Sequence, residues 1–196
     1  DGRIGRKFLH PGPGYGGSCF PKDTLALIHT AQKAGTPVRI VETVADVNDR
    51  RKRAMAARIV EACDGSVNGK TIAILGVTFK PNTDDMREAP SLEIVPALIG
   101  AGAKVRAYDP EGMKQAEPLL PGVTWCKNAY EAMTGADATA VLTEWNEFRG
   151  LGVKRMKEVM NAPVMIDLRN VYDPADMAAA GFRYSSIGRP QGLLGT

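Results

Sequence analysis

The sequence from residue 70 onward alternates short apolar runs with segments of helical periodicity. Six runs have the length and composition of buried strands, namely residues 70–77, 104–110, 123–127, 137–143, 163–170 and 182–188. Helical segments lie between them, at about 90–100, 113–117, 129–133, 144–148, 153–160 and 173–181. Because strands joined by helical crossovers pair in parallel and in a right-handed sense, this pattern predicts an α/β fold with a doubly wound parallel sheet.

The expected sheet also predicts where a ligand binds. Ligands of doubly wound sheets lie at the carboxyl ends of the strands. This rule points to four segments of the chain, residues 76–80, 109–110, 143–145 and 167–170.

The first third of the chain is expected to be helical. Apolar spacing predicts one helix over 21–34, and a second, longer helix over 37–64 begins after Gly35, with Thr36 as N-cap and Pro37 as its first residue. About 28 residues at 1.5 Å each form a rod of roughly 40 Å. Such a rod suits a spine between domains or a surface shared between subunits, so we expect a homodimer through helix 37–64.

A cysteine stands in the glycine-rich stretch "GPGYGGSCFPKD", residues 12–23. Its glycines permit tight turns and close approach to a ligand, and Pro21 favours a first helical turn. Cys19 is therefore expected just before a helix N-terminus, where the macrodipole favours a thiolate. We interpret Cys19 as a nucleophile, and Cys63 and Cys126 as buried packing residues.

Composition restricts the possible partners and compartment. The 196 residues carry a net charge of +3, which is too small to indicate nucleic acid as a partner. Three cysteines without metal-like spacing argue against a disulfide framework and for a reducing compartment, so a cytoplasmic location is expected. The sequence has no apolar run long enough to span a membrane, and His10 and His29 lack partners at metal-binding spacing, so neither a membrane nor a metal is expected.

Two stretches resemble functional motifs. "DRRKR", residues 49–53, is basic but has no interleaved aromatics, so it is interpreted as a solvated helix face. "DGSVNGKT", residues 64–71, ends like a phosphate-binding loop but precedes a strand instead of following one, which argues against that function.

Two long motifs carry a family resemblance. "RIGRKFLHPGPGYGGSCFPKD" and "LGVTFKPNTDDMREAPS", followed by "DP", "LTEW" and "DLRN", resemble the UDP-glucose/GDP-mannose dehydrogenase family, and within it the UDP-glucose 6-dehydrogenases. The similarity extends over nearly the whole chain, with the motifs in the family's order.

The resemblance implies a domain organisation. Residues 1–66 would be the end of a central helical dimerisation domain, and residues 67–196 a Rossmann-like domain that binds the UDP-sugar. The chain lacks an initiator Met, and the family's N-terminal NAD-binding domain has no counterpart in it. We therefore expect a piece of a longer enzyme that is inactive alone.

The resemblance also implies a reaction and two catalytic residues. The family oxidises carbon six of the sugar twice, from alcohol to carboxylate, with NAD as the cofactor. Cys19 matches the cysteine that attacks the intermediate aldehyde and then carries a thioester. Asp23, one helical turn further on, matches the aspartate that helps to activate water.

The remaining matches concern substrate and cofactor. Lys22 and Arg87 match residues that contact NAD. The residues that match substrate contacts are Arg3, which would reach the neighbouring subunit's site, and Phe8, Leu9, His10, Pro11, Gly12, Gly16, Phe79, Lys80 and Arg169.

Other interpretations stay open. A related enzyme could oxidise GDP-mannose or a UDP-N-acetylhexosamine, although "GGSCFPKD" fits UDP-glucose better. A nucleotide-sugar-binding or dimerisation module without catalysis is the alternative of a different class, and intact Cys19, Lys22 and Asp23 argue against it.

Overall fold

Six strands form one sheet in the computed structural model, which describes residues 5–189. The strands are β1 (Thr71–Leu75), β2 (Lys104–Tyr108), β3 (Thr124–Trp125), β4 (Ala138–Val141), β5 (Val164–Asp167) and β6 (Arg183–Ser186). Their order is β3-β2-β1-β4-β5-β6, and every neighbouring pair is parallel. The predicted doubly wound parallel sheet is confirmed, with strands shorter than the apolar runs that indicated them.

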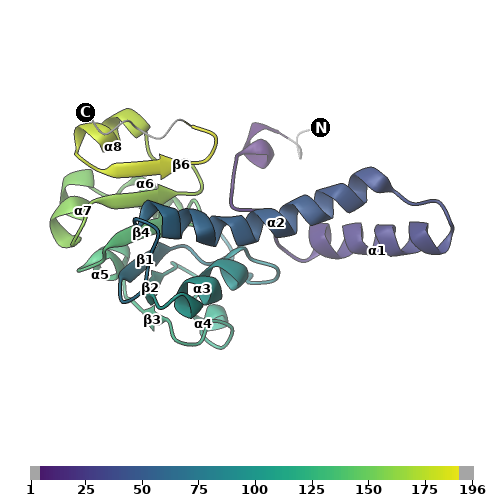
Figure 1. Cartoon of the computed structure of the whole chain (residues 1–196), viewed down its shortest axis with the longest axis horizontal. Coiled ribbons are helices and arrows are strands. Elements are labelled where there is room, and N and C mark those ends of the chain that lie inside the picture. The colour runs from purple at the N-terminus through teal and green to yellow at the C-terminus, as the bar shows by residue number, and fades with distance from the viewer. Residues whose placement is uncertain (1–4, 190–196) are drawn as a thin grey trace.

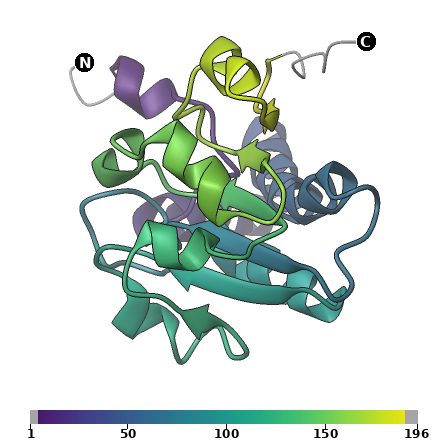
Figure 2. The same ribbon diagram turned by 90° about the vertical axis from the view of Figure 1, so that its left-hand side faces the viewer.

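Alternate residues of the strands pack into two separate cores. Ile72 and Ile74 of β1 face one core together with α2 and α3, whereas Ala73 and Leu75 face the other. This alternation follows from the two-residue period of a strand, and burial of both faces explains why the strands are continuously apolar. Figure 2 shows helices in front of the sheet and behind it.

The short helices of this region lie close to the predicted segments. They are α3 (Ser91–Gly100), α4 (Met113–Ala116), α5 (Ala129–Met133), α6 (Asn146–Arg149), α7 (Val153–Val159) and α8 (Pro174–Ala179). Helices α5 to α8 supply apolar residues to one core, and α3 supplies them to the other.

Two longer helices precede the sheet. Helix α1 spans Cys19–Lys33 and α2 spans Arg39–Ala62, so α1 begins two residues earlier than predicted and α2 two residues later. Pro21 is therefore the third residue of α1, not the first. Thr36 does not cap α2, because the helix begins at Arg39 and Val38 (φ −94°, ψ 73°) occupies the N-cap position, without a side-chain hydrogen bond to the helix.

Helix α2 packs against the sheet at its C-terminal end and extends beyond the sheet at its N-terminal end. Met55, Ala56 and Ile59 are buried in the core, whereas the first half of α2 and the antiparallel α1 project beyond the sheet as a hairpin (Figure 1). No helix among residues 5–189 is long and apolar enough to cross a membrane.

Arginine side chains attach the end of α2 to edge strand β6. Arg58 donates to the Ser185 hydroxyl at 2.9 Å, and Arg183 pairs with Asp64 at 2.6 Å. The stretch 64–71 is a connection here: Lys70 donates to the Cys63 carbonyl at 2.6 Å, which caps the end of α2.

Candidate functional site

A cleft with a volume of about 1130 Å³ opens at the carboxyl ends of β1, β4 and β5. Strand order reverses between β1 and β4, and such a switch point leaves a crevice between the loops that leave in opposite directions. Residues 79–82 line the cleft after β1, Glu144 after β4 and Arg169 after β5. Three of the four predicted strand-end segments therefore contribute to it.

The fourth segment has a different role. Asp109, at the end of β2, is fully buried and does not line the cleft. Its carboxylate accepts hydrogen bonds from the backbone of Val77 at 2.7 Å, from Gly112 at 2.8 Å and from the Trp145 indole at 3.1 Å. Asp109 thus holds together the loops that leave three strands, and it shapes the cleft from beneath.

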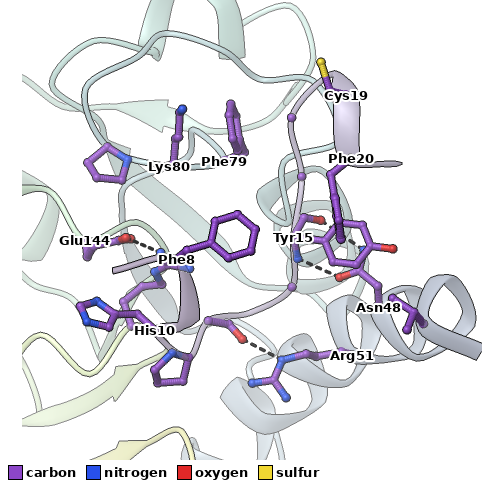
Figure 3. A pocket seen from close by; sticks show the side chains of 18 of the residues that line it. Phe8, His10, Tyr15, Cys19, Phe20, Asn48, Arg51, Phe79, Lys80 and Glu144 are labelled. Carbon is purple, nitrogen blue, oxygen red and sulfur yellow. Dashed lines mark hydrogen bonds and ion pairs between the residues drawn. The ribbon is translucent and has the colours of Figure 1, made fainter. Parts of the chain in front are cut away.

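The opposite wall comes from the N-terminal segment and from α2. Figure 3 shows Phe79 and Lys80 on one side of the cleft, Tyr15 and Phe20 on the other, and Phe8 between them. Phe8 belongs to η2 (Arg6–Leu9), a 3-10 helix.

The base of the cleft contains an ion pair between Arg169 and Glu144. Both side chains are largely buried, with exposed fractions of 14% and 18%. Gly12 lies directly against the guanidinium, since a Cβ there would stand 2.1 Å from Nη1 of Arg169. The absence of a side chain at residue 12 therefore allows Arg169 to pass beneath the N-terminal loop.

The loop after β1 presents Lys80 to the cleft. Thr78 is buried and its carbonyl accepts a hydrogen bond from the Thr143 hydroxyl at 2.6 Å. Lys80 itself is exposed, with its ammonium group 5.2 Å from the centre of the Phe79 ring. Lys80 thus has no carboxylate partner within the described part of the chain, which suits an anionic ligand.

Cys19 is the first residue of α1 and borders the cleft. Its sulfur is exposed, and the Ser18 hydroxyl lies 3.6 Å away. The expected place at a helix N-terminus is confirmed. The pKa of Lys22 is raised, mainly by its hydrogen bond to Asp23 and least by Cys19. The hydrogen bond to Asp85 likewise raises the pKa of Arg87.

Asp23 lies one turn beyond Cys19 but outside the cleft lining. It pairs with Lys22 at 2.6 Å, and both side chains are mostly exposed. Arg87 likewise lies outside the cleft and pairs with Asp85 at 2.8 Å, which lowers the pKa of that carboxyl. The neighbouring Asp84 accepts a hydrogen bond from Gln115.

The structure brings most of the predicted site residues together. Those that line the cleft are Phe8, His10, Pro11, Gly12, Gly16, Cys19, Phe79, Lys80 and Arg169. Leu9, Lys22, Asp23 and Arg87 do not line it, and Arg3 lies outside the described residues.

The other two cysteines are buried, as interpreted. Burial raises the pKa of both Cys63 and Cys126, so each favours the unreactive thiol. Within residues 5–189, no three His, Cys, Asp or Glu side chains gather as a metal site would require.

The sequence interpretation missed the contribution of α2 to the cleft. Asn48 and Arg51 line it, and Lys52 is buried with only 4% exposure. The interpretation of residues 49–53 as a solvated face is therefore wrong for Arg51 and Lys52. Polar residues at i, i+3 and i+4 between apolar Val47 and Met55 were the available signal, because that spacing places them on one face.

Comparison with known proteins shows which family has this architecture. Residues 73–174 match the family model described as the UDP binding domain of the UDP-glucose/GDP-mannose dehydrogenase family. The chain belongs to the UDP-glucose/GDP-mannose dehydrogenase family. Residues 1–50 match the central domain of the same family.

Individual members of the family are similar to this chain over almost its entire length. A UDP-glucose 6-dehydrogenase of Rhizobium meliloti (strain 1021) is 58% identical over 97% of this chain and 44% of its own length. The chain therefore spans less than half of that relative. A solved UDP-glucose dehydrogenase of Pyrobaculum islandicum (TM-score 0.78, 33% identity) matches 94% of this chain and 40% of its own.

A solved member named for a different sugar nucleotide is similar too. An NDP-N-acetyl-D-galactosaminuronic acid dehydrogenase of Methanosarcina mazei Go1 has a TM-score of 0.82 and 32% identity, covering 92% of this chain and 40% of its own. The fold is thus shared by family members that are titled for different sugar nucleotides.

Proposed function

We propose that this chain supplies the sugar-nucleotide site and the nucleophile of an NAD-dependent enzyme that oxidises UDP-glucose at carbon six to UDP-glucuronate. The observation that carries the proposal is that exposed Cys19, at a helix N-terminus, borders the same cleft as Lys80 and Arg169. The similarity to UDP-glucose 6-dehydrogenases over 97% of the chain supports the choice of substrate.

In this proposal the cleft holds UDP-glucose by charge and shape. Lys80 would meet a phosphate as a free cation, because it has no carboxylate partner among the described residues. Arg169 would contact the substrate from below the Gly12 loop, and Phe8, His10, Pro11 and Gly16 would surround it as the resemblance implies, whereas Leu9, which the resemblance also names, lies outside the cleft lining. A volume near 1130 Å³ lies slightly above the roughly 300–1,000 Å³ that is usual for ligand pockets, so the cleft has room for a nucleotide sugar.

The proposed role of Cys19 follows from sulfur chemistry. Once the sugar carbon is at the aldehyde level, the thiolate forms a bond to the carbonyl carbon, and the carbonyl oxygen takes up a proton. After the second oxidation the same carbon is a thioester, which water cleaves by breaking the C–S bond and releasing the thiolate. Asp23, one turn along α1, would assist that water, and such assistance contributes about 10²- to 10⁴-fold.

The described residues fit only the edge of an NAD molecule. Lys22 and Arg87 are exposed cations, and they would contact the edge of the NAD molecule beside Cys19. In residues 5–189, β1 is followed by Gly76 alone, without the further glycines of a pyrophosphate-binding turn. When bound, NAD⁺ supplies the hydride acceptor for each oxidation. We therefore propose that the 196-residue chain alone does not oxidise UDP-glucose.

The proposal includes the domain division and the assembly. Residues 1–66 would serve as the end of a dimerisation domain and 67–196 as the UDP-sugar domain. Ile40 supports a homodimer, since it lies on α2 outside the cleft lining and is exposed by 82%, whereas Val44 and Val47 on the same face border the cleft. Three free cysteines support the cytoplasmic location.

Binding measurements test the substrate. Thermal unfolding of the chain would be followed with UDP-glucose, GDP-mannose and UDP-N-acetylglucosamine, since a ligand of the folded state raises the unfolding temperature. We expect UDP-glucose to give the largest shift. A larger shift with UDP-N-acetylglucosamine would favour the second candidate, an N-acetylhexosamine dehydrogenase, which the similarity to the Methanosarcina mazei structure supports.

Activity measurements test the reaction. We expect no NADH from the pure chain with UDP-glucose and NAD⁺, and steady NADH formation when an NAD-binding domain precedes these residues. Hydride transfer needs the two reacting carbons within about 3–3.5 Å, and such proximity contributes ~7–11 kcal/mol. NADH formation by the pure chain, abolished by Cys19→Ala, would contradict the proposal that the reaction needs a separate NAD-binding domain.

A further inference from the structure

Three polar side chains on one turn of α2 face the neighbouring loops instead of solvent. Asn48, Arg51 and Lys52 occupy positions i, i+3 and i+4, which place them on the same face of the helix. Asn48 and Lys52 are buried, at 6% and 4% exposure. These three residues are called the α2 clasp below.

Two members of the clasp hold the loop that leads to Cys19. The Asn48 side-chain oxygen accepts from the Tyr15 amide at 2.8 Å, and its nitrogen donates to the Tyr15 carbonyl at 3.2 Å. Arg51 donates through Nε to the Gly12 carbonyl at 2.7 Å (Figure 3). The loop backbone is thus bound to the helix at two points within four residues.

The third member reaches a different loop, the one that follows β1. Lys52 donates through Nζ to the Glu88 carbonyl at 3.0 Å and lies 3.5 Å from the Glu88 carboxylate. Glu88 has a left-handed backbone (φ 53°), which L-residues adopt only where surrounding contacts stabilise it. A buried ammonium group needs such partners, so the Lys52 contact and the unusual backbone support each other.

The two loops also touch each other at this point. The Gly17 amide donates to the Arg87 carbonyl at 2.8 Å, and a Cβ on Gly16 would stand 2.4 Å from the Glu88 oxygen. Lys52 therefore anchors the carbonyl against which the Cys19 loop rests. One loop carries Cys19 and the other begins with Phe79 and Lys80.

We propose that Lys52 is a positioning residue, which sets the separation between Cys19 and the Lys80 loop without touching the substrate. Asn48 and Arg51 hold the first loop on α2, and Lys52 holds the second loop on the same helix turn. The consequence for catalysis rests on the proposed function, whereas the mechanical role rests on the contacts alone. A clasp of this kind places the nucleophile over a substrate bound by the sheet domain.

Hydrogen exchange tests the mechanical role in the chain as it exists. Lys52→Met keeps the length of the side chain but removes the donor, and we expect the Gly17 amide to exchange about tenfold faster or more. Arg53→Met is the matched control, because Arg53 is exposed and, among residues 5–189, bonds only within its own helix. Unchanged exchange at Gly17 in folded Lys52→Met would overturn the proposal.

A second variant covers the case in which Lys52→Met does not fold. Asn48→Ala releases the Tyr15 backbone but leaves the Lys52–Glu88 contact, so we expect faster exchange at Tyr15 with a smaller effect at Gly17. Equal protection of Tyr15 in this variant and in the parent chain would also overturn the proposal.

Kinetics test the consequence for catalysis in a protein that carries an NAD-binding domain before these residues. A displacement near 1 Å can cost about 10²-fold, so Lys52→Met should lower kcat by that order while KM for UDP-glucose changes little. An increase in KM with normal kcat would overturn the positioning role, since it would indicate substrate binding. If the parent protein forms no NADH while the exchange effect at Gly17 persists, the proposed function fails and the clasp stands.

Discussion

Arg169 and Glu144 follow two neighbouring strands and form an ion pair directly beneath Gly12. The N-terminal loop can therefore approach the sheet only where it has no side chain. Gly12 and Arg169, which are 157 positions apart in the chain, thus meet at the base of one cleft.

Substitution of Gly12 tests this base. In Gly12→Ala the new methyl group would displace the Arg169 guanidinium, so we expect UDP-glucose to bind about tenfold more weakly, equivalent to ~1.4 kcal/mol. Gly100→Ala is the control, because a Cβ there meets nothing within 4 Å. Calorimetric titration of both variants measures the effect, and equal affinities would show that Arg169 does not contribute to binding.

Substitution of Cys19 tests the nucleophile in a protein with an NAD-binding domain. Cys19→Ser should release no UDP-glucuronate, because an oxygen ester formed at this residue leaves far less readily than a thioester. Chromatography of the products after long incubation measures this. Cys126→Ala, which removes a buried thiol outside the cleft, should keep the parental rate. UDP-glucuronate release by Cys19→Ser at that rate would make the assignment wrong.

The exposed apolar face of α2 predicts a concentration-dependent dimer. Ile40→Lys should shift the chain toward monomer in sedimentation, since it places a charge on the most exposed large apolar side chain of the described residues. Ala57→Lys adds the same charge at an exposed site near the sheet end of α2 and should leave the dimer intact. A parent chain that is monomeric at high micromolar concentration would count against pairing through α2.

Tyr108 predicts a loss of stability at alkaline pH. Burial, and next its 3.0 Å hydrogen bond to Glu147, raises the pKa of Tyr108 from 10.0 to about 12. The folded state thus holds its proton more tightly than the unfolded state, so this contribution is complete below pH 10.0 and is lost as the pH rises to about 12. Denaturant unfolding at several pH values measures the free energy of unfolding.

The matching variant is Tyr108→Phe. It should be less stable near pH 8, because it loses the bond to Glu147, yet its stability should fall less steeply between pH 10 and 12. Burial also raises the pKa values of Tyr172 and Tyr184, so part of the alkaline decline should remain. An identical slope in variant and parent would exclude Tyr108 as a source of the decline.

Local patterns in the sequence determined the elements and the chemistry of the chain. Period-two and period-3.6 spacing reflects which face of an element is buried, so the six strands and the helices could be predicted with errors of a few residues at their ends. The strand-end rule located Lys80, Glu144 and Arg169, because parallel strands bring their carboxyl ends to one edge. The glycine-rich stretch located Cys19 through turn chemistry.

Contacts between distant segments were decided only by the tertiary structure. The residues 49–53 are all charged in the sequence, yet packing turned Arg51 and Lys52 inward and left Arg53 in solvent. Which face of a charged turn is buried depends on the loops that meet it, and here these are 33 to 39 positions away. Local spacing carries no information about such partners, because a buried polar group is stabilised by whatever donor or acceptor the fold brings to it.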